Sequence, residues 1–196
     1  MNIANKLTVA RLISAPILMV VMLIPESILP LKLACAIAAL LFLAASVTDF
    51  LDGHLARKHH LITDFGKFFD PLADKFMVIG ALLVILYRFG ELRFYVLILT
   101  ATVIFRELAV TSVRLIASTS KDALVIPANI LGKIKTVFQM VFIAAVLVES
   151  ALWADVCPVL LGYPVSVISM IGTFIMTVWS GVNYIYSYRK YINTTK

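Results

Sequence analysis

Charged residues are scarce in this sequence: they make up 14% of its 196 residues, whereas hydrophobic residues make up 62%. A soluble domain contains about 25% charged residues and roughly 45–50% apolar ones. This composition excludes a water-soluble globular protein, and it also excludes a disordered chain, because disorder requires low hydrophobicity. A polytopic membrane protein remains, since about 20 consecutive apolar residues suffice for each crossing of a bilayer.

Cysteine is also rare, and long polar stretches are missing. Cys35 and Cys157 lie in unrelated segments without the short spacing of a metal-binding or redox pair, so both are expected to be packing residues. The N-terminal segment lacks the small-residue cleavage pattern of a secretory signal peptide. No low-complexity tract or polar appendage is evident. We therefore expect a single membrane domain over residues 1–196.

Six apolar segments are long enough to cross a membrane as helices, which predicts an all-α fold with six transmembrane helices in one bundle. Proline and glycine interrupt the chain between several of these segments. The segments run over residues 9–24, 33–50, 68–87, 94–116, 134–152 and 159–187.

The basic residues are divided unevenly between the two ends of these segments. Six crossings place both termini on one side, together with the second and fourth connections. The opposite side holds only three of the 17 Lys and Arg residues: Lys32, Arg88 and Arg93. Because basic residues accumulate in cytoplasmic loops, both termini are predicted to be cytoplasmic, in a multi-pass protein of the cell membrane. In so apolar a chain, the net charge of +6 favours contact with anionic lipid over nucleic acid.

Four carboxylates, Asp49, Asp52, Asp70 and Asp74, lie near the ends of the second and third segments. A carboxylate at the bilayer centre costs about 2.5–3.5 kcal/mol, and four together also repel one another. A bound cation would offset both effects, and oxygen-only ligands favour Mg²⁺, Mn²⁺ or Ca²⁺ over zinc. The acids of each pair are three or four residues apart and share one helix face, which predicts a cup for one or two metal ions.

Each acid taken alone has a simpler explanation. Asp70 precedes Pro71 and could cap the start of a helix, and Asp49 could pair with Arg57. If the third helix instead begins near Thr63, Pro71 lies inside it and should kink it by removing one backbone hydrogen bond. The four acids together are better explained by a ligand site.

Eight positions of the sequence resemble the signature of the CDP-alcohol phosphatidyltransferases. They read Asp49-x-x-Asp52-Gly53-x-x-Ala56-Arg57, then eight residues, then Gly66-x-x-x-Asp70-x-x-x-Asp74. The resemblance implies a six-helix membrane enzyme, usually a homodimer, that requires Mg²⁺ or Mn²⁺. Such an enzyme exchanges the CMP of a CDP-linked lipid for an alcohol.

The resemblance also implies a role for each matched residue. The four aspartates would hold the metal ions, and Asp74 would also act as the general base on the attacking hydroxyl. The CDP-linked lipid would contact the other signature positions and a less strict motif near the N-terminus. These predicted nucleotide-side residues are Asn5, Thr8, Arg11, Asp52, Gly53, Ala56, Arg57 and Gly66.

A group of basic residues lies near the predicted cytoplasmic ends of the fourth and fifth segments. Arginine at membrane depth is costly unless it faces a partner, although long basic side chains can also extend to an interface. Several cations near a metal site would bind an anionic acceptor, and arginine grips phosphate through two parallel hydrogen bonds. The predicted acceptor-binding residues are Arg106, Arg114, Lys133 and Lys135.

These basic segments resemble the branch of the family that joins sn-glycerol 3-phosphate to CDP-diacylglycerol, giving phosphatidylglycerophosphate and CMP. A phosphate-bearing acceptor fits the positive charge better than serine or inositol does. Two alternatives stay open: a cardiolipin synthase of the same family, with phosphatidylglycerol as acceptor, and a cation-coupled transporter, since intramembrane acids are also typical of transporters. The acids cluster at one face, which argues against transport. After Gln139 the chain shows only apolar character.

Overall fold

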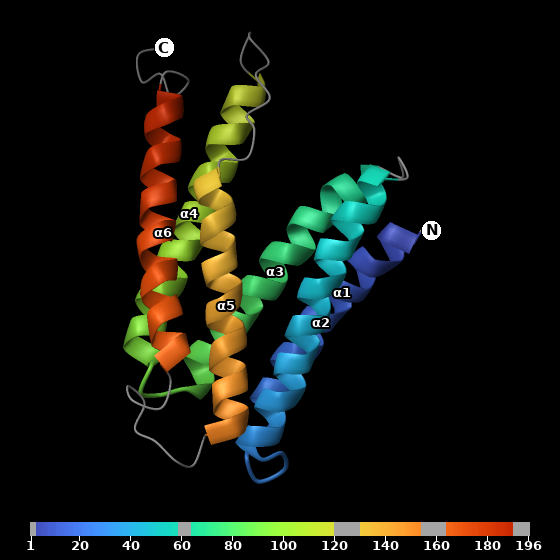
Figure 1. The fold of residues 1–196 in the computed structure, drawn as a ribbon, viewed down its shortest axis with the longest axis vertical. Coiled ribbons are helices and arrows are strands. Elements are labelled where there is room, and N and C mark those ends of the chain that lie inside the picture. The colour runs from blue at the N-terminus through green and yellow to red at the C-terminus, as the bar shows by residue number, and fades with distance from the viewer. Residues whose placement is uncertain (1–2, 59–63, 120–129, 154–163, 190–196) are drawn as a thin grey trace.

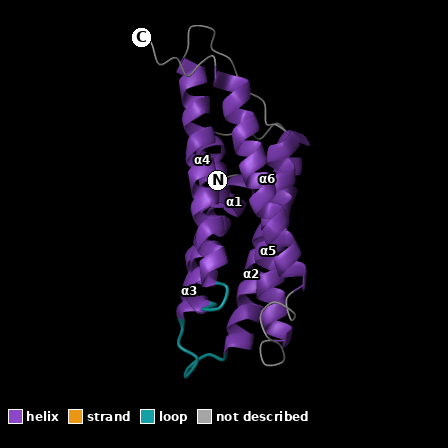
Figure 2. Ribbon diagram, turned by 90° about the vertical axis from the view of Figure 1, so that its left-hand side faces the viewer, coloured by secondary structure: helices purple, strands orange, loops and turns teal. Residues whose placement is uncertain are grey.

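The computed structural model describes residues 3–58, 64–119, 130–153 and 164–189. The side chains of residues 3, 4, 50–58, 64, 67, 117–119 and 153 fall outside this description. The described residues form helices and no strand (Figures 1 and 2). The helices are α1 (Ile3–Leu23), α2 (Leu31–Lys58), α3 (Asp64–Arg88), α4 (Arg93–Thr119), α5 (Ile130–Trp153) and α6 (Pro164–Tyr188). The predicted all-α fold with six helices is confirmed.

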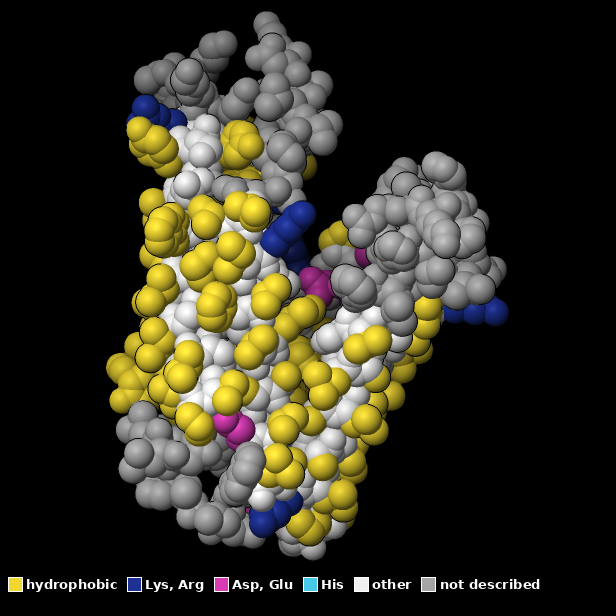
Figure 3. All heavy atoms as spheres, in the orientation of Figure 1, with side chains coloured by type: hydrophobic (Ala, Val, Ile, Leu, Met, Phe, Trp, Pro, Cys, Tyr) yellow, Lys and Arg dark blue, Asp and Glu magenta, His cyan; other side chains and the backbone are white. Residues whose placement is uncertain are grey.

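Within the described ranges, every helix except α3 is long and apolar enough to span a membrane. The exception arises because Asp70, Asp74 and Lys75 lie in the first half of α3, ahead of its apolar run. Many outward-facing side chains are apolar (Figure 3), and Leu40 and Phe105 are 70% and 71% exposed, as suits helices surrounded by lipid. The chain is a multi-pass integral membrane protein, and the crossing by α3 stays a prediction.

The helices extend beyond several of the predicted apolar segments. Helix α1 begins at Ile3 rather than residue 9, α2 continues to Lys58, and α3 begins at Asp64. Pro71 therefore lies inside α3, and Asp70 is not a helix cap. The apolar windows marked only the lipid-embedded part of each helix, and polar residues continue these helices past it. The predicted start of the last segment, 159–163, falls outside the described residues.

The helices fall into two groups of three that form a fork in Figure 1. Helix α1 packs against α2 and α3, while α6 packs against α4 and α5. Helix α3 also packs against α4, and α2 also packs against α5, so both contacts join the groups. The start of α1 and the end of α6 lie at the open end of the fork, as an even number of crossings requires.

The core and the face of α6 are built from different kinds of residue. Large apolar side chains such as Leu18, Phe42 and Phe142 are fully buried where α1, α2 and α5 meet. Helix α6 instead buries small hydroxyl side chains and one tyrosine: Ser166, Ser169, Thr173, Thr177, Ser180 and Tyr184. Small residues let membrane helices approach closely. The expectation that this last segment has only apolar character is wrong, because apolar neighbours at the remaining positions dominate its average hydropathy.

The hydroxyl groups on α6 do not remain unsatisfied inside the protein. Thr173 and Thr177 each donate to the carbonyl oxygen one turn earlier, at 2.7 and 2.6 Å. At the start of α6, the buried Glu149 of α5 accepts hydrogen bonds from the backbone N–H groups of Val165 (3.0 Å) and Ser166 (3.1 Å). The carboxylate of one helix therefore caps the positive end of the next.

Gly172 marks the closest approach between α5 and α6. A Cβ atom at this position would lie 2.5 Å from the ring of Phe138, so the ring would have to move. We expect Gly172→Ala to destabilise the protein by about 1–3 kcal/mol through overpacking. A thermal unfolding scan of the purified protein in detergent measures this as a lower Tm. Gly90→Ala is the control, because its Cβ would meet only Arg93 at 3.9 Å; equal Tm values for the two variants would contradict the expectation.

Candidate active site

Helix α1 connects the two helices that carry the predicted metal ligands. Thr8 and Arg11 lie three residues apart on α1 and are 1% and 3% exposed. Thr8 donates a hydrogen bond to Asp70 of α3, and Arg11 forms an ion pair with Asp49 of α2. A buried guanidinium requires such a partner. The acids of α2 and α3 are therefore brought together through α1, and the described parts of α2 and α3 have at most slight contact with each other.

The structure places the N-terminal motif beside the aspartates, as expected for one site. Asn5 lies one turn before Thr8 on α1, so the three residues of the motif follow one another along the helix. On α3, Gly66 is buried one turn before Asp70. These positions agree with the predicted nucleotide-side residues, whose roles stay predictions.

The remaining signature residues lie on α2, beyond Asp49. Asp52, Gly53, Ala56 and Arg57 fall in the part of α2 whose side chains are outside the described residues. Because the helix continues unbroken to its end, Asp52 and Ala56 follow Asp49 at intervals of three and four residues, which places them near one helix face. Their roles also stay predictions.

The predicted metal site can be assessed from the chemistry of its ligand side chains. Among the side chains that the structure describes, no three His, Cys, Asp or Glu residues form a group that could hold an ion. The fourth predicted ligand, Asp52, falls outside those side chains. The carboxylates suit Mg²⁺ or Mn²⁺, which prefer oxygen ligands. The buried Arg11 offsets one of these carboxylates through its ion pair with Asp49. The residues present fit a hard divalent cation, and the site stays a prediction.

Asp74 lies between this carboxylate group and a group of basic residues. The charges of Asp49 and Arg11 act on its carboxyl group, and so do those of Glu107 and Lys135. Asp74 lines a cavity of about 140 Å³ between α3, α4 and α5. Its polar lining consists of Asp74, Lys75, Arg106, Glu107, Lys135, Thr136 and Gln139. We call this the Asp74 cavity.

A second cavity of about 200 Å³ lies between α4, α5 and α6, and we call it the basic cavity. It is lined by Arg106, Arg114, Gly132, Lys133, Thr136, Ser180 and Tyr184. Arg106 and Thr136 line both cavities, so the two adjoin. Three of the four predicted acceptor-binding residues line the basic cavity, and the fourth, Lys135, lines the Asp74 cavity instead. Figure 3 shows charged side chains between the two arms of the fork.

Arg106 is held between the three helices of the second group. Its Nη1 donates to Glu107 at 3.0 Å, and its Nε donates to Ser180 of α6 at 3.2 Å. Two glycines make room for it: a Cβ on Gly132 would lie 3.2 Å from Nη2, and one on Gly181 would lie 3.2 Å from Cγ. The guanidinium group therefore has a defined position at the boundary between the two cavities.

The other cations have different partners. Lys135 donates to Glu107 at 2.8 Å, and Lys75 lies 3.9 Å from the same carboxylate, so Glu107 offsets positive charge beside Asp74. In the basic cavity, Arg114 donates to the hydroxyl of Tyr184 at 2.9 Å, and its guanidinium lies 5.6 Å from the centre of that ring. Tyr184 is neutral, so this contact leaves the charge of Arg114 available to an anion.

Sequence reasoning missed the residues of α6 that hold the two arginines. Ser180 and Tyr184 are buried and four residues apart. The one available signal was the recurrence of hydroxyl residues every three or four positions along this helix. Sequence alone could not distinguish a close-packing face from a set of hydrogen-bond partners.

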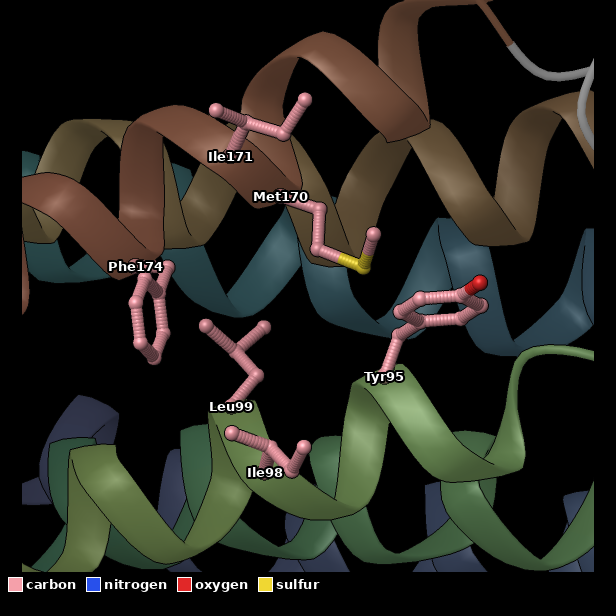
Figure 4. A pocket seen from close by; sticks show the side chains of 6 residues that line it. All are labelled: Tyr95, Ile98, Leu99, Met170, Ile171 and Phe174. Carbon is pink, nitrogen blue, oxygen red and sulfur yellow. The ribbon is translucent and has the colours of Figure 1, made fainter.

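An apolar groove of about 230 Å³ lies between α4 and α6 (Figure 4). It is lined by Tyr95, Ile98, Leu99, Met170, Ile171 and Phe174. This lining offers neither a carboxylate nor a cation. The two polar cavities are therefore the candidate active site.

Comparison with known proteins agrees with the signature. The sequence model for CDP-alcohol phosphatidyltransferase matches residues 1–179. The CDP-diacylglycerol–glycerol-3-phosphate 3-phosphatidyltransferase of Bacillus subtilis (strain 168) is 39% identical over 193 residues, covering 93% of each chain. The proteins of that name from Rickettsia felis and Salmonella choleraesuis are 33% and 31% identical, covering 97% and 94% of this chain, and 97% and 93% of their own. The chain belongs to the CDP-alcohol phosphatidyltransferase family.

Proposed function

We propose that this protein transfers the phosphatidyl group of CDP-diacylglycerol to sn-glycerol 3-phosphate, producing phosphatidylglycerophosphate and CMP for phospholipid biosynthesis. The observation that carries this proposal is the position of Asp74, beside a cavity that adjoins a second, basic cavity, with Arg106 lining both. A reactive carboxylate and a phosphate-binding region are thereby joined. The similar proteins of Bacillus subtilis and Rickettsia felis are named for the same donor and acceptor.

Asp74 acts as the general base in this reaction. It accepts the proton of the acceptor hydroxyl as that oxygen attacks the phosphorus of the phosphatidyl group. The bond from this phosphorus to the bridging oxygen breaks, and CMP leaves with the electron pair. The diphosphate bond is already activated, so the reaction proceeds by direct displacement without a covalent enzyme intermediate.

The acidic side of the site binds the donor. Asp49, Asp52, Asp70 and Asp74 would hold one or two Mg²⁺ or Mn²⁺ ions, which would neutralise the diphosphate charge when bound. The nucleotide lies near α1 and the start of α3, against the N-terminal motif and Gly66. Thr8 and Arg11 orient Asp70 and Asp49 through their hydrogen bonds, so α1 serves both halves of the donor site.

The basic cavity binds the phosphate of the acceptor. Arg106, Arg114 and Lys133 supply the positive charge. On α6, each of these arginines has a hydroxyl partner that adds no negative charge, although Arg106 also pairs with Glu107. An incoming phosphate would gain charge-assisted hydrogen bonds from both guanidinium groups. Lys135 instead pairs with Glu107 and lines the Asp74 cavity. Its positive charge acts on the carboxyl group of Asp74.

The distribution of charge supports an orientation in the membrane. The start of α1 and the end of α6 lie at the open end of the fork, which is the predicted cytoplasmic end (Figure 1). Lys133 and Tyr184 of the basic cavity lie near the start of α5 and the end of α6. The active site therefore faces the cytoplasm at the cell membrane, where water-soluble glycerol 3-phosphate is available and lipid tails enter from the bilayer. The family resemblance supports a homodimer, and the apolar composition supports membrane lipids rather than nucleic acid as the surroundings.

An acceptor panel tests the function directly. The purified protein in lipid nanodiscs receives CDP-diacylglycerol, Mg²⁺ or Mn²⁺, and either glycerol 3-phosphate, phosphatidylglycerol, serine or inositol. We expect CMP release and a new lipid, detected by mass spectrometry, when glycerol 3-phosphate is the acceptor and with none of the other three acceptors. EDTA should abolish both CMP release and lipid formation. Product with phosphatidylglycerol but not with glycerol 3-phosphate would identify a cardiolipin synthase. No CMP release with any acceptor would remove the enzymatic function and favour transport.

Replacing the general base should slow turnover strongly while the protein still binds CDP-diacylglycerol. We expect Asp74→Asn to lower kcat by about 10²–10⁴-fold, the usual contribution of a general base. The affinity for CDP-diacylglycerol, measured by isothermal titration, should change much less. Glu91→Gln, in the exposed turn before α4, is the control and should keep full activity. Near-normal kcat in the Asp74 variant would assign the base to another residue.

Removing Arg106 should weaken acceptor binding selectively. A hydrogen bond to a charged group contributes about 1.5–3 kcal/mol, so Arg106→Ala should raise the KM for glycerol 3-phosphate by roughly 10–100-fold. The KM for CDP-diacylglycerol should stay nearly unchanged. Arg93→Ala removes an exposed arginine at the other end of α4 and should alter neither constant. If the Arg106 variant raised both KM values equally, Arg106 would not belong to the acceptor site.

A further inference from the structure

Gln139 has a buried amide group that none of the contacts described so far explains. Its side chain is 2% exposed and lines the Asp74 cavity. Within the described part of the chain, its Nε2 atom has no hydrogen-bond partner. Leaving a buried donor unpaired costs about 1–3 kcal/mol, and such groups are rare in native structures. A polar group in this position therefore indicates a partner that occupies the cavity.

The position of Gln139 relates it to both cavities. It follows Thr136 by three residues on α5, so the two side chains share a helix face. Thr136 lines both cavities, whereas Gln139 lines only the one that contains Asp74. A ligand that reaches from the basic cavity to Asp74 would therefore pass along this face of α5 and meet Gln139 near the reactive carboxylate.

Glycerol 3-phosphate carries three polar groups in a row. The basic cavity takes its phosphate, and Asp74 takes the proton of its C1 hydroxyl. The C2 hydroxyl lies between them, is neutral, and both donates and accepts hydrogen bonds. A side-chain amide matches it, because the group can present its N–H or, after a half-turn, its carbonyl oxygen. The cations beside it are better suited to phosphate.

We propose that Gln139 binds the C2 hydroxyl of the acceptor and thereby selects glycerol 3-phosphate over a phosphorylated alcohol that lacks this group. This inference rests on the proposed function of the site. It makes Gln139 a specificity-determining residue that contacts substrate, and it explains why the cavity beside Asp74 contains a neutral amide among charged side chains.

The test compares two acceptors that differ by one hydroxyl. For the wild type and Gln139→Leu, kcat/KM is measured with sn-glycerol 3-phosphate and with 3-hydroxypropyl phosphate, which lacks only the C2 hydroxyl. The wild type should prefer glycerol 3-phosphate by about tenfold or more, because an unpaired buried amide penalises the analogue. Gln139→Leu should lose this preference, with a lower value for glycerol 3-phosphate and little change for the analogue.

Two further variants separate specificity from folding. If Gln139→Leu is unstable, Gln139→Met offers an unbranched apolar side chain of similar length for the same comparison. Thr100→Val is the matched control: Thr100 is also buried, its hydroxyl has no partner among the described residues, and it is not among the residues that line the two cavities. It should keep the wild-type preference.

The outcomes distinguish this inference from the function on which it rests. Absence of product from the wild type with glycerol 3-phosphate would reject the proposed function. If the wild type makes product but does not distinguish the two acceptors, only the role of Gln139 fails. The role also fails if the Gln139 variants keep the preference, or if they lower kcat/KM for both acceptors by the same factor.

Discussion

Charged and polar side chains at membrane depth must find partners, and these partners join the helices of this protein at its functional end. Lipid supplies no hydrophobic drive for one apolar helix to pack on another, so close packing and polar contacts decide which helices associate. Arg11 with Asp49 joins α1 to α2, and Thr8 with Asp70 joins α1 to α3. Glu107 with Lys135 joins α4 to α5. The polar contacts that join these helices therefore also build the site.

The two groups of polar contacts have opposite character, and each suits one substrate. Around α1, carboxylates exceed basic groups among the described side chains, which suits a donor whose diphosphate is bound through divalent cations. Around α4 to α6, arginine and lysine dominate, which suits a free phosphate. The carboxyl group of Asp74 interacts electrostatically with charged residues of both groups. A general base in this position can meet a hydroxyl that arrives from the basic side and a phosphorus atom held on the acidic side.

Sequence reasoning found the parts of the site that depend on local spacing. The aspartates and the N-terminal motif were identified because three- and four-residue intervals define a helix face. The basic residues of α4 and α5 were identified from their charge near the helix ends and from the family resemblance. Two features depend on contacts between distant segments and could not be inferred this way: the position of α1 between α2 and α3, and the pairing of Arg106 with Ser180. The ends of several helices were also predicted wrongly. Hydropathy shows which residues suit the lipid, whereas a helix ends where its backbone hydrogen bonding ends.

The last helix shows how packing and substrate binding depend on the same residues. Small hydroxyl side chains let α6 approach its neighbours, and this approach brings Ser180 and Tyr184 within hydrogen-bonding distance of Arg106 and Arg114. Carboxylates in their place would hold the arginines equally well but would also neutralise them. The hydroxyls position both guanidinium groups without adding negative charge. Arg114 therefore keeps its charge available to an anion, whereas Glu107 pairs with Arg106 and Lys135 close to Asp74. The acceptor phosphate then supplies the negative charge that the basic cavity lacks, so the site favours an anionic acceptor through its charge balance as well as its shape.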